Sequence, residues 1–471
     1  MYEGIHKYLK ECGKIILISI GVSATSSLIL YKNIGMSTSF MLFIALLCLI
    51  IDLYLIYKDR RKSIIIFLLL LPIYTTVRRI CYFDIFFIKV TFETIYITVL
   101  FASSFRDVIK TVKNLSFNFM FMILAFFLFC VNSSFYSVDI LGALSEVYIG
   151  VLTPIMFMLC FMTYFNKDDK NKIYYILISA LDFSCLYGFV QLLSKGISLT
   201  SIRDNRISLT FGFNNVNIFA GILIAVFPLL IEMILYKKNS RKEKLVLYSS
   251  FLLYSISLLI TFSRGAWICY IAIIFMSLYS KKYRKVFVAL LVPALFIAKP
   301  VFHYIISRGT TTSFLNNESA VARLQSIFTD IILMKKYPFG IGGGNFAEAY
   351  KNFSLEGYFA MPKYIRYRAI APSYTLENAH NLILQIGVEF GIAAACIFVL
   401  IIINRLKTAA KNLNYSRGAF NSIFIYFVFS LITGNEFDHK GIIMGTIIMF
   451  AMFSIIELYL KKDMENKRKI I

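Results

Sequence analysis

Apolar stretches recur along nearly the whole of this 471-residue chain, and hydrophobic residues make up 59% of it. A helix must present about 20 apolar residues to cross a hydrocarbon layer of roughly 30 Å, and many of these stretches approach that length. A segment inside a bilayer has to satisfy its own backbone hydrogen bonds, which a helix does. The sequence therefore predicts an all-α integral membrane protein and excludes a large water-soluble core.

The predicted number of transmembrane helices is about fourteen, with a range of about twelve to fourteen. The stretches near 63, 266 and 286 are shorter than the usual length, so each would have to tilt, extend or re-enter on the same side. The predicted spans are, in chain order, 15–31, 37–57, 63–77, 91–105, 115–131, 147–165, 173–193, 217–236, 245–262, 266–279, 286–299, 383–403, 419–434 and 441–460.

The net charge of +23 would indicate a nucleic-acid partner in a soluble protein. Here most Lys and Arg lie in short connectors between apolar stretches, such as KDRRK at 58–62, KKNSRKEK at 237–244 and the tail KKDMENKRK at 461–469. Connectors of this kind are retained on the cytoplasmic side by the positive-inside rule. We therefore expect a cell-membrane protein with both termini cytoplasmic, a lipid bilayer around it and no nucleic-acid partner.

Cysteine and histidine do not occur in the spacings that hold metal ions. The eight cysteines are scattered, mostly inside apolar stretches, and no two of them form a CxxC pair. We interpret them as small apolar side chains in the packing of the helices. The sequence therefore predicts neither a metal site nor a cofactor.

One long polar segment, at about 300–382, interrupts the apolar stretches. By the same charge asymmetry it lies outside the cell membrane, since long loops are translocated whatever their charge. It separates a central region, 200–403, which contains it, from N-terminal helices at 1–199. C-terminal helices and a cytoplasmic tail follow at 404–471.

Apolar residues recur at helical spacing in AVARLQSIFTDIILMKK, at 320–336 within the polar segment. This pattern predicts an amphipathic helix that lies on the membrane or over a cavity and ends before Pro338. The glycine-rich GIGGGNF at 340–346 could present backbone N–H groups to an anion. Because no strand precedes it and no GK[ST] follows, we favour a flexible turn over a nucleotide-binding loop.

The segment ITFSRGAWI places Arg264 between two apolar stretches with almost no polar connector. Its guanidinium would lie at or just inside the outer boundary of the membrane, where charge is costly and commonly functional. The alternative is an arginine that extends from a tight Ser-Arg-Gly turn to the interface and serves only as an anchor.

A second basic pair, Arg203 and Arg206, lies in an outer connector that leads directly into a span. A guanidinium offers a rigid fork of donors that matches phosphate oxygens in a bidentate way, which lysine does not. A pyrophosphate group would suit this pair. The alternative is a solvated loop in which Arg203 pairs with Asp204.

His380, one of only four histidines, lies beside Asn381 where the polar segment re-enters the membrane. Histidine titrates near neutrality and can take a proton from a hydroxyl nucleophile. A single histidine is more often structural. Its position at the membrane mouth, on the same side as the arginines, favours a catalytic role.

The order of these motifs resembles the O-antigen ligase and polymerase superfamily, membrane glycosyltransferases that act on polyprenyl-diphosphate-linked glycans outside the cytoplasmic membrane. The family commonly has proline where Val216 and Gly343 stand, differences that affect backbone shape more than chemistry. The resemblance covers about residues 200–400 and rests on RISLTFGFNNVNIFAG at 206–221, SRGAW at 263–267, ARLQSIFTD at 322–330, YPFGIGGGNF at 337–346 and HNLILQIGVEFGI at 380–392.

The resemblance implies a fold of the GT-C-like type and a catalytic region at 200–403. Arg206 and Arg264 would bind the diphosphate of a polyprenyl (undecaprenyl) diphosphate donor, with Arg203 and Arg323 as additional phosphate contacts. His380 would activate or orient the acceptor hydroxyl of a glycan or glycolipid. Transfer would need no metal and would invert the anomeric centre, and other membrane proteins of polysaccharide assembly are expected partners.

Two functions of other classes stay open. A flippase for lipid-linked oligosaccharides, or another secondary transporter, also has many spans, and Asp52, Glu93, Asp182 and Glu232 lie within or at the ends of predicted spans. A non-catalytic scaffold in glycan assembly is the other alternative. Within the enzyme hypothesis, polymerase and ligase differ only in the acceptor, which the sequence does not specify.

The charge asymmetry predicts the sidedness of the chain. A cysteine at Asn316, in the long polar segment, should react with an impermeant thiol reagent in cells stripped of any outer barrier. A cysteine at Asn239, in a basic connector, should not. Labelling in the reverse pattern would contradict the orientation and every site assignment that depends on it.

Overall fold

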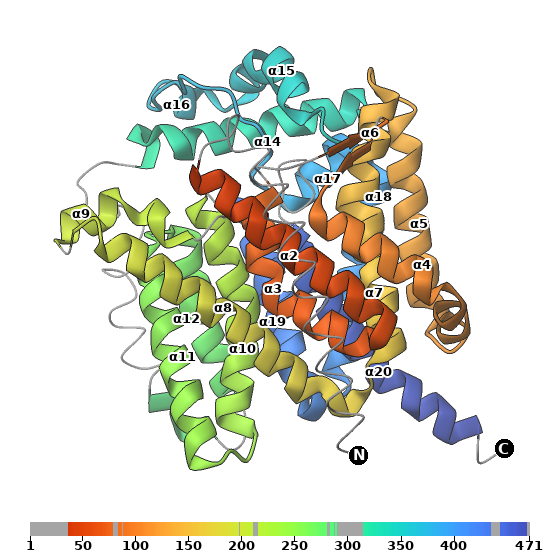
Figure 1. The fold of residues 1–471 in the computed structure, drawn as a ribbon. Coiled ribbons are helices and arrows are strands. Elements are labelled where there is room, and N and C mark those ends of the chain that lie inside the picture. Colours follow the sequence, from red (N-terminus) through yellow and green to blue (C-terminus); the bar gives the residue numbers. More distant parts are fainter. Residues whose placement is uncertain are drawn as a thin grey trace, which may run out of the picture.

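Helices make up almost all the regular structure in the computed structural model, which describes residues 36–78, 83–86, 88–196, 198–210, 215–279, 283–286, 288–289, 314–434 and 443–468 (Figure 1). The exception within these ranges is a short antiparallel hairpin of β1 (Phe83–Ile85) and β2 (Ile88–Val90). The predicted all-α membrane architecture is confirmed.

Three consecutive groups of helices build the fold. The first is α2 (Met36–Lys58), α3 (Arg60–Arg78), α4 (Phe92–Val112), α5 (Phe117–Ser134), α6 (Ile140–Val147), η1 (Tyr148–Leu152), α7 (Thr153–Tyr164), η2 (Lys167–Asp169) and α8 (Lys170–Leu193). The second is α9 (Leu199–Asp204), η3 (Arg206–Thr210), α10 (Val216–Tyr236), α11 (Arg241–Ile260) and α12 (Arg264–Leu278). The third is η4 (Phe314–Asn316), α14 (Glu318–Lys336), α15 (Phe346–Ala360), α16 (Lys363–Arg366), α17 (Leu382–Phe390), α18 (Ile392–Ala410), α19 (Leu413–Thr433) and α20 (Ile443–Arg468).

Polar side chains at the helix ends explain several of these boundaries. Ser240 and Glu243 form a capping box before α11, in which each side chain accepts a hydrogen bond from the backbone N–H of the other residue. Asn317 caps α14 by accepting from the N–H of Ala320 at 3.1 Å. These bonds satisfy N–H groups that have no partner within the first turn of a helix.

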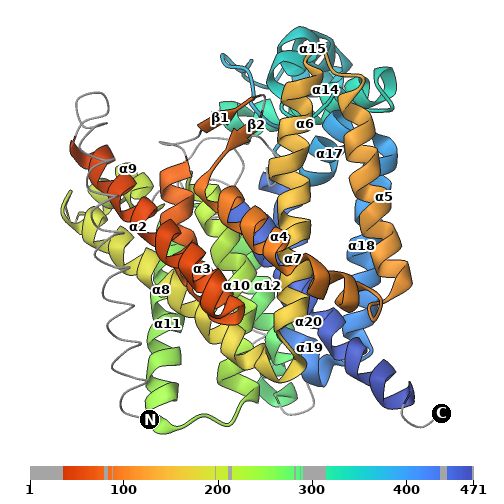
Figure 2. The ribbon, with the colours of Figure 1, turned by 45° about the vertical axis from the view of Figure 1, so that its right-hand side comes forward.

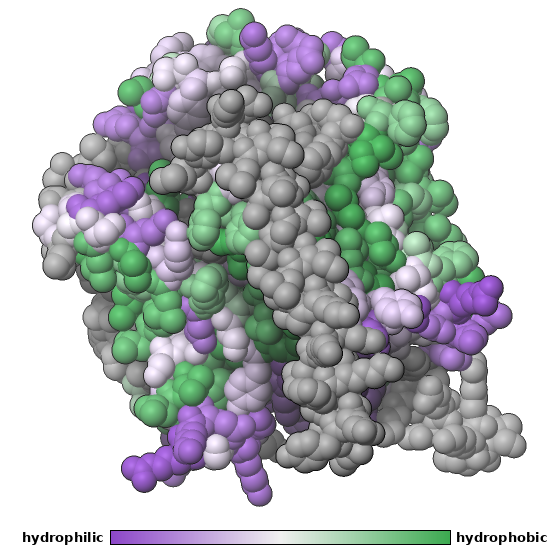
Figure 3. All heavy atoms as spheres, viewed as in Figure 1, coloured by the Kyte–Doolittle hydropathy of each residue, from purple (hydrophilic) through white to green (hydrophobic). Residues whose placement is uncertain are grey.

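Seven helices in the described part of the chain are long and apolar enough to cross a membrane. They are Phe117–Ser134, Ile140–Tyr164, Lys167–Leu193, Val216–Tyr236, Arg241–Ile260, Ile392–Ala410 and Leu413–Thr433, with Arg264–Leu278 and Gly445–Leu460 as shorter apolar helices. Figure 3 shows hydrophobic side chains over the middle of the helices, and hydrophilic ones gathered at the two ends of the molecule. This distribution fits a multi-pass membrane protein.

The predicted number of fourteen spans is not confirmed. The predicted span 15–31 lies outside the described residues, and 286–299 lies almost entirely outside them. The prediction of one continuous span at 383–403 is wrong, because two helices, α17 and α18, meet there at a break. Gly391 forms the break with a φ of 94°, a left-handed conformation that favours glycine.

The predicted amphipathic helix at 320–336 is confirmed as α14, which ends at Lys336, two residues before Pro338. It lies across one end of the helical bundle, and α15 and α16 lie beyond it on the side away from the bundle (Figures 1 and 2). We call the end of the bundle that α14 covers the capped end. The basic connector between α10 and α11 lies at the opposite end, so the two regions predicted to face opposite sides of the membrane are indeed at opposite ends of the molecule.

The centre of the bundle is formed by α10, α12 and α19, which pack closely around one aromatic ring. A Cβ atom on Gly221 of α10 would lie 2.9 Å from the ring of Phe429, and one on Gly265 of α12 would lie 3.5 Å from it. The Ser422 hydroxyl of α19 donates to the carbonyl of Ala225 on α10 at 2.5 Å. This packing fixes where α10 and α12 begin at the capped end.

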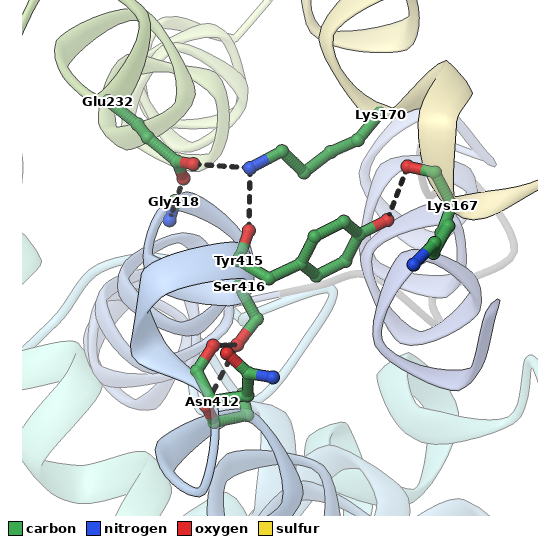
Figure 4. A network of polar contacts seen from close by, with 8 residues as sticks. Lys167, Lys170, Glu232, Asn412, Tyr415, Ser416 and Gly418 are labelled. Atoms are coloured by element: carbon green, nitrogen blue, oxygen red, sulfur yellow. Dashed lines mark hydrogen bonds and ion pairs between the residues drawn. The ribbon is translucent and has the colours of Figure 1, made fainter. Parts of the chain in front are cut away.

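A polar network joins α8, α10 and α19 at the opposite end (Figure 4). The Lys170 ammonium lies 2.6 Å from a carboxylate oxygen of Glu232 and also donates to the carbonyl of Tyr415 at 2.6 Å. The other carboxylate oxygen accepts from the N–H of Gly418, and the Tyr415 hydroxyl donates to the carbonyl of Lys167. Each buried charge therefore has a partner, as the low dielectric requires.

A second ion pair lies within the bundle between α18 and α20. Arg405 and Glu457 are 1% and 0% exposed, and their closest nitrogen and oxygen atoms are 2.5 Å apart. The guanidinium also lies over the ring of Phe119, and the second Glu457 oxygen accepts from the N–H of Ser116 at 2.6 Å. The pair thus connects α18 and α20 to the start of α5.

We expect Arg405→Ala to destabilise the protein strongly, because it leaves the Glu457 carboxylate buried without its cation. Loss of one partner of a buried pair costs about 3–5 kcal/mol, so the thermal unfolding temperature in detergent should fall clearly. Arg60→Ala is the control, since the Arg60–Asp107 pair is partly exposed and should contribute about 1 kcal/mol or less. Equal unfolding temperatures for the two variants would contradict this account.

Candidate functional site

A cavity of about 360 Å³ lies at the capped end, between the starts of α10, α12 and α17, the end of α19 and the underside of α14. Three of the residues selected from the sequence, Arg264, Arg323 and His380, line it together. The other lining residues are Asn217, Ser263, Gly265, Ile268, Ala320, Leu324, Ile327, Ala379, Asn381, Leu431, Ile432 and Thr433. None of these described lining residues is acidic, so the cavity is electropositive.

The helix termini add to this positive potential. Asn217, Arg264 and Asn381 lie at the N-terminal ends of α10, α12 and α17, and all three line the cavity. A helix N-terminus has a partial positive charge, which stabilises an anion placed near it. Three N-termini that meet at one cavity therefore favour an anionic ligand over a neutral one.

Arg264 is the first residue of α12, and the backbone on either side of it is held in place. Ser263 precedes it, and its hydroxyl donates to the side-chain oxygen of Asn217 on α10 at 2.9 Å. Phe262 has a φ of 51°, an unusual conformation for a residue with a side chain. This turn directs the start of α12 to the cavity.

Arg323 approaches the cavity from the opposite wall, on α14. Burial and the neighbouring Arg264 both lower the pKa of its guanidinium, while Tyr374 raises it. A guanidinium keeps its proton at neutral pH even so, because its ordinary pKa is very high. Its Nε atom is buried with no hydrogen-bond partner among the described residues. Arg264 and Arg323 line the same cavity, and two like charges in one cavity favour binding of an anion between them.

His380 has a φ of 51°, which costs about 1–2 kcal/mol for a residue with a Cβ atom. Its backbone N–H donates to the side chain of Asn378 at 3.2 Å. The preceding N–H, that of Ala379, donates to the side chain of Gln385 on α17 at 2.7 Å. Strained conformations that the surroundings hold in place are frequent at functional sites.

α14 also contacts the backbone immediately before His380. The Ser326 hydroxyl lies 3.1 Å from a carboxyl oxygen of Asp330 and 3.5 Å from the carbonyl of Ala379. Asp330 is fully buried, and burial raises the pKa of its carboxyl group well above the ordinary value. The position of His380 therefore depends on contacts from both α14 and α17.

The glycine-rich segment 340–346 forms the predicted turn, and hydrogen bonds hold it against α17. The N–H groups of Ile341 and Gly342 donate to the carbonyls of Val388 and Glu389, at the end of α17. The N–H of Gly344 donates to the Glu389 side chain at 3.0 Å. These groups are used to fasten the segment to the break between α17 and α18, so they are not presented to an anion.

Arg206 is not placed with these three, and Arg203 is not tested. Arg206 begins η3, which packs on α8 and α10, and it is not among the residues that line the cavity. Arg203 lies on α9, and its side chain is outside the described part of the structure. The structure therefore brings together three of the five predicted residues.

Several lining residues were not selected from the sequence. Asn217 and Asn381 are the last polar residues before apolar stretches, a signal that could have identified them. Asn381 accepts from the N–H groups at the start of α17, and its amide donates to the carbonyl of Leu431 at the end of α19, at 2.9 Å. The end of α19 lines the cavity with Leu431, Ile432 and Thr433, which belong to no motif in the sequence.

No group of three or more His, Cys, Asp or Glu side chains among the described residues could hold a metal ion together. The chemistry of the cavity described here is that of guanidinium, imidazole, amide and hydroxyl groups.

The family model for O-antigen ligases matches residues 249–399 of the chain. The match includes Arg264, Arg323 and His380 and begins after Arg203 and Arg206. It confirms the resemblance to the O-antigen ligase and polymerase superfamily that the motifs indicated. No curated protein matches the chain.

Proposed function

We propose that this protein, with its O-antigen ligase region at 249–399, transfers a glycan from a polyprenyl (undecaprenyl) diphosphate donor to an acceptor hydroxyl. The proposal rests on one observation, that Arg264, Arg323 and His380 line the same cavity. It combines two phosphate-binding groups with one group able to accept a proton. We place the reaction at the extracytoplasmic face of the cell membrane, following the charge asymmetry of the connectors.

The proposed donor fits the charge of the cavity. A diphosphate ester is a compact polyanion, and arginine binds phosphate oxygens through two parallel hydrogen bonds. Arg264 and Arg323 would hold the diphosphate between α12 and α14, and the N-termini of three helices would add to its stabilisation. Because both arginines lie at the capped end of the bundle, the polyprenyl chain can stay in the bilayer while the glycan extends outward.

In the proposed reaction the acceptor oxygen attacks the anomeric carbon, and the bond from that carbon to the diphosphate oxygen breaks. The acceptor proton passes to His380, and polyprenyl diphosphate leaves with the bonding electrons. Arg264 and Arg323 stabilise the charge that develops on the departing diphosphate. Attack opposite the leaving group inverts the anomeric centre, and the arginines provide the positive charge without a metal.

Arg206 has a different place in the proposal. Since it is not among the lining residues, it would contact the donor only where the donor extends past the start of α10. Arg203 on the adjacent α9 would serve the same outer part of the ligand. Both remain proposed phosphate contacts, less directly supported than Arg264 and Arg323.

The transporter alternative has less support from the described residues. Asp52 accepts from the Tyr74 hydroxyl at 2.6 Å, and Asp182 accepts from the Ser250 hydroxyl at 2.7 Å. Glu232 pairs with Lys170 at the opposite end from the cavity. Each of these three carboxyl groups thus joins a different pair of helices, a structural role that accounts for its place in the bundle.

The acceptor, a glycan or a glycolipid, separates polymerase from ligase. Incubation of the purified protein with the lipid-linked oligosaccharide donor alone tests this directly. A ladder of products would identify a polymerase, and product only after a second acceptor is added would identify a ligase. Other membrane proteins of polysaccharide assembly are the partners we propose for either activity.

We expect Arg264→Lys to lose most transfer activity in this assay while expression stays normal. Lysine keeps the charge but not the bidentate fork, so the departing diphosphate loses one of its two parallel hydrogen bonds. Arg241→Lys, at the first residue of α11 and at the opposite end from the cavity, is the matched control and should transfer at the wild-type rate. Normal turnover by Arg264→Lys would reduce Arg264 to an interface anchor.

We expect His380→Ala to lower transfer on the order of 100- to 10,000-fold, the range of general-base contributions. Donor affinity should change little, because the diphosphate is held by arginines. Wild-type activity should rise with pH through an imidazole titration, since only the neutral ring accepts a proton. A variant with the normal rate and the same pH profile would show that the histidine is structural.

A further inference from the structure

Aromatic side chains are unusually exposed in and after α15 and α16. Tyr367 is 85% exposed, Tyr364 69% and Phe359 60%, and the adjacent Arg368 is exposed as well. We call these four residues the aromatic surface. The Arg366 guanidinium lies over the Phe359 ring, so the end of α15 contacts α16. Large aromatic side chains that are exposed in one such segment are typical of a surface that binds a partner.

This surface differs from the exposed face of α5. The large hydrophobic side chains exposed there are aliphatic or phenylalanine, such as Phe117, Phe121 and Leu124. The aromatic surface instead has two tyrosine hydroxyls and a guanidinium. It also belongs to the layer beyond α14, on the side away from the bundle (Figures 1 and 2). Both observations favour an occupant in the aqueous phase over the bilayer.

The chain leads from the aromatic surface directly to the cavity. The N–H of Ile370 donates to the carbonyl of Leu315 before α14, and Ser373 donates to the Glu318 carboxylate in the first turn of α14. The next residue, Tyr374, is near enough to Arg323 to raise the pKa of that guanidinium. The segment thus lies against the start of α14, whose next residues, Ala320 and Arg323, line the cavity.

The chemistry of the aromatic surface suits a carbohydrate. A pyranose ring has C–H groups on its faces and hydroxyls at its edge, so it stacks on an aromatic ring and hydrogen-bonds at the rim. Tyrosine provides both kinds of contact with few rotatable bonds. Lys363 and Arg368 can pair with acidic groups on the sugars. The last two turns of α15 contain one acidic residue, Glu356, so basic groups predominate over residues 356–368.

We propose that the aromatic surface is a glycan-binding subsite that holds the sugar chain as it extends from the cavity. The inference rests on the proposed transfer reaction, and it adds a specificity-determining surface that the reaction centre does not contain. Two or three successive sugars would stack on Tyr364, Tyr367 and Phe359. Longer glycans should therefore bind more tightly than single repeats.

The test measures binding without requiring turnover. Wild-type protein in lipid nanodiscs is titrated with oligosaccharides of increasing length, released by mild acid from the lipid-linked donor of the producing cells. Tyr364→Ala combined with Tyr367→Ala should raise the dissociation constant about tenfold for the longer oligosaccharides, as expected for the loss of two stacking contacts. Transfer to the shortest acceptor should stay unchanged. The control is Tyr248→Ala, on α11, which removes a tyrosine that is 55% exposed outside the aromatic surface and should bind like wild type.

The outcomes separate this inference from the proposed function. Length-dependent binding that depends on the two tyrosines, in a protein without transfer activity, would support the subsite and contradict the function. Transfer with equal glycan affinity in wild type and variant, or no glycan binding by wild type, would overturn the subsite. A bimane label at Tyr367→Cys, in a background without the native cysteines, tests the bilayer alternative. Quenching of that label by brominated lipids would also overturn the proposal.

Discussion

Charge inside a hydrocarbon layer must be paired or moved to its boundary, and this constraint organises the whole molecule. Within the bundle, Lys170 is paired with Glu232 and Arg405 with Glu457. The basic connectors and the polar helices α14 to α16 are at opposite ends. The candidate site follows the same rule, since its arginines lie where the bundle ends and a polar layer begins.

The cavity exists because two parts of the chain meet at that boundary. Helices α10, α12 and α19 pack around Phe429, and the close approach of its ring to α10 requires a residue without a Cβ atom at Gly221. The later segment from α14 to α17 closes over them, fastened by the glycine-rich turn at the α17–α18 break. Site geometry thus depends on residues that take no part in the proposed chemistry.

The structure also gives different positions to residues for which the sequence predicted the same role. Arg206 and Arg264 both precede apolar spans and both carried the same phosphate hypothesis, but only Arg264 lines the cavity. The glycine-rich segment forms the predicted turn, and its N–H groups hold it against α17. In both cases the outcome depends on which segment, far away in the sequence, packs beside the residues concerned. A local sequence pattern does not contain that information.

The sequence by itself determined the helical membrane architecture, the amphipathic α14 and the separation of basic connectors from the polar segment. These follow from composition and periodicity within windows of about 20 residues, because each span is selected by its own transfer free energy into the bilayer. It also identified Arg264, Arg323 and His380 as candidates. Only the tertiary structure decided that these three share one cavity, that α17 and α18 are separate helices, and that Asn217, Asn381 and the end of α19 complete the lining. The reason is that close contacts between segments far apart in the chain depend on side-chain packing and on positive-φ turns such as those at Phe262, His380 and Gly391, none of which a local pattern of hydrophobicity specifies.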